Sequence, residues 1–131
     1  MIFDFELNTP SQGLVDITRE VSEAVSESGV YDGICIIFCP HTTAAITINE
    51  NADPDVRTDF VNGMNGTFPE RNEFRHLEGN SDAHLKSSSV GASEIIIINK
   101  NKLLLGTWQG IYFCEFDGPR KRKFYVKIMK G

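Results

Sequence analysis

Short runs with strand character recur from one end of the chain to the other, and they restrict the fold more than any other feature. Near the start, Phe3, Phe5 and Leu7 alternate with acidic residues, which is the period-two pattern of a half-buried strand. Further runs rich in β-branched and aromatic residues predict strands at residues 33–39, 44–49, 94–98, 103–105, 110–117 and 124–129. The chain is therefore expected to fold mainly as β-sheet.

Two helices are expected among these strands. Thr18 can cap a helix whose apolar positions follow helical spacing and which ends before Gly29. Asp53 and Pro54 form a typical helix start, because the aspartate caps free N–H groups and proline needs no donor in the first turn. This second helix is expected to end near Asn62. Residues 63–89 lose periodicity and are expected to form one long loop of the kind kept for function.

The pattern predicts a single α+β domain, mainly β, over residues 1–131, with sandwich or jelly-roll-like sheet packing and two or three short helices. No apolar run approaches the roughly 20 residues of a membrane span. The acidic N-terminus does not resemble a secretion signal. We therefore expect a cytoplasmic protein without membrane contact, in which Cys35, Cys39 and Cys114 are reduced core thiols.

Charge is unevenly distributed along the chain. The net charge is −5, yet six of the thirteen basic residues lie in the last twelve positions. The run GPRKRK, residues 118–123, is expected to be an exposed turn between two strands. Since the acidic remainder of the chain would repel a phosphate backbone, nucleic acid is not expected as a partner.

The chain has three histidines, His41, His76 and His84, and each lies near hydroxyl or carboxylate side chains that can orient a ring. Neutral imidazoles are common zinc ligands, and three of them leave a fourth position open for water or substrate. One histidine alone would be interpreted as a surface residue, but the joint pattern favours a shared metal site. The spacing matches no established zinc signature.

Two segments have the composition of an anion site. Lys86 and the serines at 87–89 offer a cation and hydroxyl groups for phosphate oxygens, with a solvated loop or helix cap as the alternative. In LGTWQG, residues 105–110, two glycines flank a threonine and can turn backbone N–H groups toward an anion, with a tight hairpin as the alternative. Neither a P-loop nor a GxGxxG fingerprint is present, so nucleotide-driven chemistry has no support.

Three motifs, HTTAAITINENADPDV, HLEGNSDAHLKSSSVGAS and LLLGTWQGIYFCEFDGPRKRK, resemble in order and spacing the secondary thiamine-phosphate synthase family, the YjbQ-like proteins. The resemblance covers nearly the whole chain. It implies a small β-rich domain that assembles as a trimer, with the histidines as metal ligands and a phosphate or sulfate site nearby. NSDAH stands where many members have a DDMPAH-like run, so acidic support for the ligands rests on Asp82 alone.

The expected function is a metal-dependent enzyme with weak thiamine-phosphate synthase-type activity, which joins a pyrimidine methyl diphosphate to a thiazole phosphate and releases pyrophosphate. The alternatives are metal-assisted hydrolysis of a phosphorylated small molecule and a non-catalytic metal- or phosphate-binding module. The expected cofactor is a divalent metal, zinc, with magnesium as the alternative for a diphosphate substrate. The expected residues are His41, His76 and His84 for the metal, Thr42, Thr43, Lys86, Ser87, Ser88, Thr107 and Gln109 for the anion, and Glu50, Glu78, Asp82 and Lys86 for catalysis.

Overall fold

The computed structural model describes residues 1–131 and shows an α+β fold that is mainly β. The elements follow one another in the order β1 (Ile2–Asn8), β2 (Gly13–Asp16), α1 (Thr18–Ser28), β3 (Asp32–Phe38), β4 (Ala44–Glu50), α2 (Pro54–Thr67), α3 (Ser81–Val90), β5 (Ser93–Asn99), β6 (Lys102–Leu103), β7 (Gln109–Glu115) and β8 (Lys121–Lys130). The predicted class and the first helix are confirmed. The predicted cap is wrong, because Thr18 is the first helical residue and the N-cap is Ile17, which makes no side-chain cap hydrogen bond. None of the three helices is long and apolar enough to cross a membrane.

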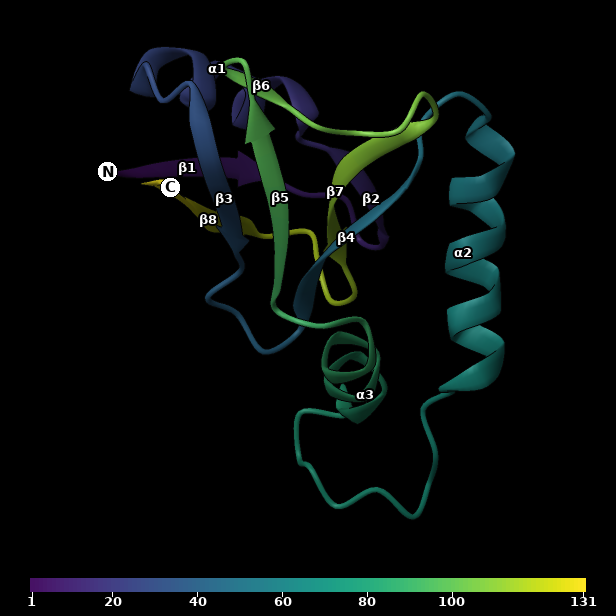
Figure 1. Ribbon diagram of the computed structural model, residues 1–131. Helices are drawn as coiled ribbons and strands as arrows, with labels where there is room; N and C mark the ends of the chain where they lie inside the picture. Colours follow the sequence, from purple (N-terminus) through teal and green to yellow (C-terminus); the bar gives the residue numbers. More distant parts are fainter.

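Two antiparallel sheets pack face to face (Figure 1). The larger has the strand order β1-β8-β3-β5-β6, and the smaller has the order β2-β7-β4. Ile37 and Val126 of the larger sheet share one buried cluster with Phe113 of the smaller sheet. Helix α1 adds Val21 and Val25 to the same cluster. The strands therefore form the sandwich that their sequence pattern predicts.

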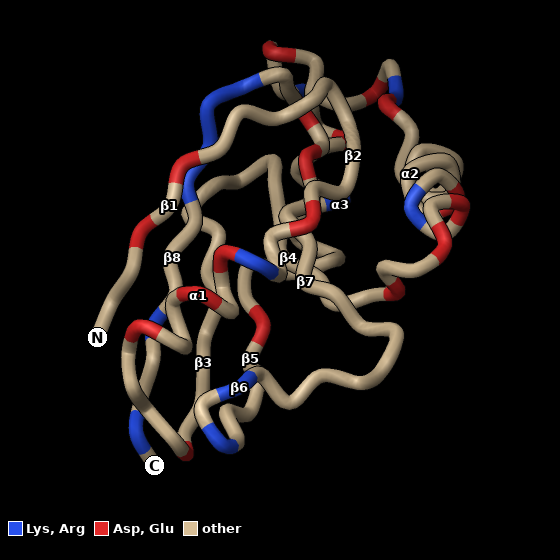
Figure 2. The backbone as a smooth tube through the Cα atoms, turned by 90° about the horizontal axis from the view of Figure 1, so that it is seen from above, with Lys and Arg blue, Asp and Glu red and all other residues tan.

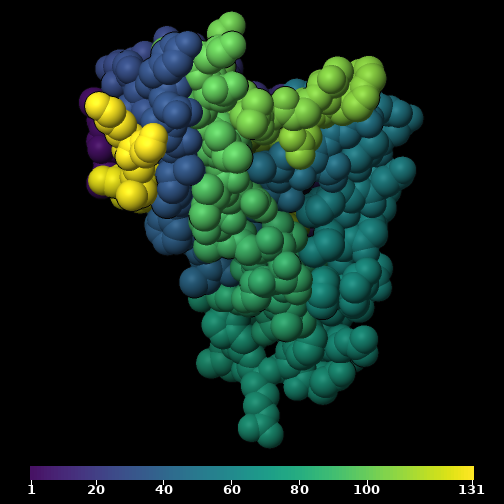
Figure 3. All heavy atoms as spheres, viewed as in Figure 1, coloured from purple at the N-terminus to yellow at the C-terminus, as the bar shows by residue number.

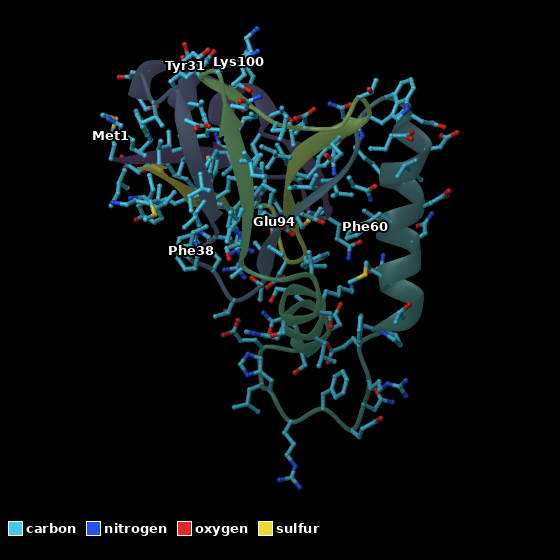
Figure 4. All side chains as sticks on the ribbon, viewed as in Figure 1. Met1, Tyr31, Phe38, Phe60, Glu94 and Lys100 are labelled. Atoms are coloured by element: carbon cyan, nitrogen blue, oxygen red, sulfur yellow. The ribbon has the colours of Figure 1, made fainter.

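The outer face of the larger sheet is apolar as well. Strand register places Ile34 beside Ile97 and Ile36 beside Ile95. Ile95 and Ile97 remain 61% and 55% exposed, where a one-sided antiparallel sheet normally carries polar residues. β3 and β5 lie side by side at the front of Figure 3, and Phe38 projects from the end of β3 in Figure 4. We call this surface the outer apolar face; it comprises Ile34, Ile36, Phe38, Ile95, Ile97 and Met129.

The prediction of one long loop over residues 63–89 is wrong at both ends. Helix α2 continues past Asn62 to Thr67, and α3 occupies residues that were expected to be loop, so only residues 68–80 lack helix or strand. The glycines at 63 and 66 face open space and do not break α2. Helix α3 buries Ala83, Lys86 and Ser87, and this small or polar face produces no hydrophobic periodicity in the sequence.

Helix α2 lies beside the sandwich and contacts it lightly (Figure 1). Its start is as expected, since the Asp55 N–H donates to the Asp53 carboxylate at 2.9 Å. None of its residues is fully buried, and Phe60 and Met64 pack only partly against a small cluster around Phe116. Residues 68–80 then form the narrow end of the molecule, which leads into α3 (Figure 3).

Candidate functional site

A pocket of about 390 Å³ at the α3 end of the sandwich brings the three histidines together. They come from three segments: His41 from the β3–β4 connection, His76 from the loop before α3, and His84 from α3 itself. None of the lining residues is hydrophobic. We call this site the histidine pocket; it is lined by Pro40, His41, Thr42, Thr43, His76, Glu78, Asn80, His84, Arg120 and Arg122.

His41 is held by the start of β8. Pro40 follows the end of β3, and the chain turns so that the Lys123 N–H donates to His41 Nε2 at 2.9 Å. Burial lowers the pKa of His41, and the positive charge of Arg122 lowers it further. Its ring is therefore neutral at neutral pH, with its proton on Nδ1 because Nε2 is an acceptor.

His76 and His84 face each other across the mouth of the pocket. Their ring centroids lie 5.2 Å apart, with the ring planes nearly perpendicular at 89°. Glu78 Oε1 is 3.9 Å from His76 Nε2, and the His76 side chain is 44% exposed. This pair is thus the open, solvent-facing part of the site.

The donor chemistry suits zinc, but the arrangement does not yet form a metal site. No group of three His, Cys, Asp or Glu side chains is placed to hold a metal ion. His41 Nε2 already accepts a hydrogen bond from Lys123. Binding a metal ion through Nδ1 would require the ring proton to move to Nε2. There it would clash with the Lys123 N–H, which already points at Nε2. The three histidines share a pocket, and metal binding by them stays a prediction.

Arg122 forms a buried wall of the pocket and is 4% exposed. Its guanidinium makes a two-point ion pair with Glu115, and Nη2 also donates to Thr43 Oγ1 at 2.8 Å. Burial alone would raise the pKa of Glu115, but hydrogen bonds from Arg122 and Thr9 outweigh it and hold that pKa below its usual value. Both groups are therefore charged.

The expected exposed turn at residues 118–123 is thus wrong for Arg122. Strand β8 begins at Lys121, and its alternation places Arg122 on the same inward face as Phe124. Extending the period-two pattern of residues 124–129 backward by two positions would have found it. The basic side chains beside it face outward, where Lys121 lies 3.1 Å from Glu6 of β1; Figure 2 shows the basic start of β8 next to acidic positions of β1.

A second pocket, of about 430 Å³, adjoins the first and shares His41, Thr42 and His84 with it. Ser87 and Ser88 of α3 line this adjoining pocket. Ser87 is fixed, since its hydroxyl donates to the Thr42 carbonyl at 2.5 Å. Two of the expected anion-binding residues therefore lie next to the histidines, on the far side of the His41–His84 wall.

Lys86 points away from both pockets, contrary to its expected role as an anion ligand and catalytic residue. It is 1% exposed, and Nζ donates to Asp82 Oδ2 at 2.9 Å and to Asn65 Oδ1 at 2.6 Å. Two residues along a helix turn the side chain by about 200°, so Lys86 lies opposite His84. Burial raises the pKa of Asp82, but the hydrogen bonds from Lys86 and its other donors leave that pKa lowered. The hydrogen bond from Lys86 to Asn65 joins α3 to α2.

Three other expected residues lie at the opposite end of the smaller sheet. Register pairs Glu50 with Gln109, whereas Ala44 near the histidines pairs with Glu115. Seven residues of strand separate these ends by about 20 Å. The Gln109 side chain accepts a hydrogen bond from the Gly106 N–H at 2.8 Å, and Thr107 is exposed. The GTWQG segment is therefore a tight turn, closed by a hydrogen bond from the Gln109 N–H to the Gly106 carbonyl at 3.1 Å. It is not the hairpin of the alternative interpretation, because it connects β6 of the larger sheet to β7 of the smaller sheet, and these strands do not pair.

Comparison with known proteins decides the family. The family description "UPF0047 protein YjbQ-like" matches residues 3–131. The chain belongs to the YjbQ-like family. A UPF0047 protein of Methanocaldococcus jannaschii is 58% identical over 130 residues, which cover 98% of this chain and 94% of that protein. YugU of Bacillus subtilis is 55% identical over 122 residues, which cover 92% of each.

Solved structures of YjbQ-like proteins share the fold. A YjbQ/UPF0047 family protein from Clostridium acetobutylicum superimposes with a TM-score of 0.95 at 55% identity, over 97% of this chain and 99% of that one. A protein from Sulfolobus solfataricus, described as YbjQ-like and of unknown function, gives a TM-score of 0.95 at 33% identity, over 100% and 97%. The names of these relatives and structures identify a family but no reaction.

All three cysteines of this YjbQ-like chain are buried and unpaired, as the sequence predicts. Burial raises the pKa of Cys39 to about 11, so it is a protonated thiol at neutral pH. It packs in the main core cluster. Cys39 therefore has no nucleophilic role in the pocket.

Proposed function

We propose that this chain is an enzyme that acts on a phosphorylated small molecule in the histidine pocket. The observation that carries the proposal is that all three histidines share one pocket with Arg120 and Arg122, and that no hydrophobic residue lines it. Imidazoles transfer protons near neutral pH, and guanidinium groups bind phosphoryl oxygens at two points. The volume of about 390 Å³ falls in the range of small-molecule sites.

The reaction we propose is a transfer of the thiamine-phosphate synthase type, which the motif resemblance implies. The thiazole nitrogen attacks the methylene carbon of the pyrimidine methyl diphosphate, so that a C–N bond forms as the C–O bond to pyrophosphate breaks. Negative charge grows on the leaving pyrophosphate, and fixed donors in the pocket stabilise it. The two pockets on either side of His41 and His84 offer separate space for the two substrates, which supports a transfer.

Hydrolysis of a phosphorylated small molecule is the second candidate. The observation that favours it is the open His76–His84 pair at the mouth of the pocket, because an imidazole that water can reach can accept a proton from it. In that reaction the adjoining pocket holds only the leaving group or solvent. If neither reaction occurs, the remaining alternative is a non-catalytic phosphate- or metal-binding module.

Metal dependence is a separate part of the proposal. Three imidazoles make a zinc donor set, and magnesium is the alternative with a diphosphate substrate. A zinc site that uses Nε2 of His41 would require this ring to give up its hydrogen bond with the Lys123 N–H. Bound zinc supplies Lewis-acid stabilisation of negative charge. Metal analysis of the purified protein and of the His41→Ala, His76→Ala and His84→Ala variants tests this part without an activity assay.

Assembly as a homotrimer is also proposed. The outer apolar face is a contiguous hydrophobic surface on a small domain, and such surfaces usually mark contacts with other proteins. We propose that a second copy of this chain covers it, in the closed threefold ring that the family resemblance implies.

One assay separates the candidate reactions. Purified protein is incubated with the pyrimidine methyl diphosphate and the thiazole phosphate, and thiamine phosphate, pyrophosphate and free phosphate are measured together. The transfer yields thiamine phosphate and pyrophosphate in equal amounts, whereas hydrolysis yields free phosphate or pyrophosphate without thiamine phosphate. We expect His84→Ala to abolish the activity and Arg19→Ala, on the exposed surface of α1, to retain it. Absence of turnover with a broad panel of phosphorylated metabolites would leave only the binding module.

A further inference from the structure

The guanidinium of Arg122 has one nitrogen that the fold does not use. Nε and Nη2 donate to the two carboxylate oxygens of Glu115, and Nη2 also donates to Thr43. Nη1 carries two further N–H groups and makes no hydrogen bond within the chain. Arg122 is 4% exposed as a whole, and Nη1 is not among the fully buried side-chain atoms that lack a partner, so these two donors remain accessible to a solvent molecule or ligand.

The unused nitrogen is the part of the side chain that is left for the histidine pocket. Glu115 is completely buried and fixes one edge of the guanidinium plane. Arg122 nevertheless lines the pocket beside His41 and His84. A rigid, planar fork held along one edge presents its remaining N–H groups in a fixed direction. Two donors are therefore oriented in advance, with no side-chain entropy left to lose on binding.

We propose that Nη1 of Arg122 is the oxyanion-binding donor of the histidine pocket and that its ligand is a phosphate group. The inference rests on the proposed function and adds the residue that recognises the phosphate. A tetrahedral phosphate has several free oxygens that accept from different directions. Arg120 and Thr42 line the same pocket. Nε and Nη2 of Arg120 already donate to Asp117, so Nη1 of Arg120 and the Thr42 hydroxyl are left for the oxygens that Arg122 does not bind. A planar carboxylate would use fewer of these donors.

This assignment replaces Lys86 as the expected anion ligand. Lys86 Nζ is directed at Asp82 and Asn65, whereas Arg122 is the buried cation that reaches the histidines. Its charge already acts on the site, because it helps to lower the pKa of His41. A bound phosphate would offset that charge and let the His41 pKa rise toward its usual value, a consequence separate from affinity.

Calorimetric titration with inorganic phosphate tests the inference in the full-length protein. Arg122→Lys keeps the positive charge but removes the planar guanidinium with its fixed N–H groups. If Arg122 acted through its charge alone, phosphate affinity would change little. We expect phosphate affinity to fall about tenfold to a hundredfold, the range for a lost charge-assisted hydrogen bond. Arg19→Lys is the matched control, because the Arg19 side chain is 83% exposed on α1, and it should bind phosphate as the parent does. Acetate should bind the parent far more weakly than phosphate; equal binding would overturn the phosphate assignment.

A second measurement needs no substitution at the buried pair. In protein labelled with ¹⁵N-arginine, the guanidinium signals of Arg122 can be assigned through bonds and followed as phosphate is added. The inference predicts that they shift and saturate with the calorimetric affinity while those of Arg19 stay still. Phosphate binding without movement of the Arg122 signals overturns the inference and leaves the proposed enzyme intact. Movement of the signals in a protein that turns over no phosphorylated compound keeps the inference and overturns the enzyme.

Discussion

Arg122 and Glu115 form a two-point ion pair inside the protein, in which Nε donates to Oε1 at 2.7 Å and Nη2 donates to Oε2 at 2.5 Å. The Thr9 hydroxyl and the Asp117 N–H donate to the same carboxylate. The pair joins β7 to β8 directly behind the histidine pocket. Hydrogen bonds within the protein stabilise both buried charges. Among the guanidinium nitrogens, only Nη1 is left for another partner.

Removing one member of this pair should destabilise the fold strongly. Arg122→Met leaves a carboxylate buried without its cation, which costs about 3–5 kcal/mol in the free energy of unfolding. The double variant Arg122→Met/Glu115→Leu should be less destabilised than the single one, because no charge remains buried. Urea unfolding of the parent and both variants at pH 7 measures this. A single variant as stable as the parent would contradict the described pair.

The same pair predicts how stability depends on pH. The pKa of Glu115 is lower in the folded protein than its usual value of 4.5. The stabilisation that ionised Glu115 contributes to the free energy of unfolding is therefore complete above about pH 4.5. It is lost as the pH falls through the lower pKa that Glu115 has in the folded protein. In Arg122→Met, Glu115 is buried without a cation, and burial raises its pKa. Because protonation then removes the buried charge, the difference in free energy of unfolding between parent and variant should shrink as the pH falls. Unfolding curves between pH 3 and 7 give the comparison.

His41 should titrate below its usual pKa of 6.5, because burial and the charge of Arg122 both disfavour the protonated ring. The unfolded chain then takes up the proton first, so this histidine lowers stability as the pH falls below about 6.5. A proton NMR titration reads the pKa directly, and His41→Gln should remove this part of the pH dependence. A His41 pKa above 6.5 would be inconsistent with its contacts.

The sequence predicted seven of the eight strands, because alternation records which face of a strand is buried. It missed β2 (Gly13–Asp16), whose four residues are too few to show an alternation. It also selected all three histidines of the pocket. It missed helix α3, since the buried face of that helix consists of Ala83, Lys86 and Ser87 and carries no hydrophobic period. Lys86 and Arg122 were assigned the wrong surroundings for a related reason: a buried cation depends on a partner distant in sequence, and composition alone treats it as exposed.

Lys86→Met should leave phosphate affinity unchanged and lower the free energy of unfolding by about 1–3 kcal/mol, because Asp82 and Asn65 lose a buried donor. Lys100→Met, in the exposed turn between β5 and β6, is the matched control and should change neither quantity. Calorimetry with inorganic phosphate and urea unfolding provide the two readings. Loss of phosphate affinity in a folded Lys86→Met protein would return this lysine to the site.

The outer apolar face should hold copies of the chain together. Light scattering should give three times the chain mass of 14.7 kDa at micromolar concentration. Ile97→Asp places a charge on this face and should shift the mass toward the single chain, whereas Leu77→Asp, at a fully exposed loop position, should not. A parent protein that scatters as a single chain would contradict the trimer.

The imidazole NMR spectrum tests the central claim most directly, because the chain has only three histidines and all three line one pocket. Every ring signal therefore reports on that site. Titration with pyrophosphate should move the signals of His41, His76 and His84 together, with one shared dissociation constant. If pyrophosphate at millimolar concentration leaves all three signals in place, the histidine pocket does not bind phosphorylated molecules and the proposed function is wrong.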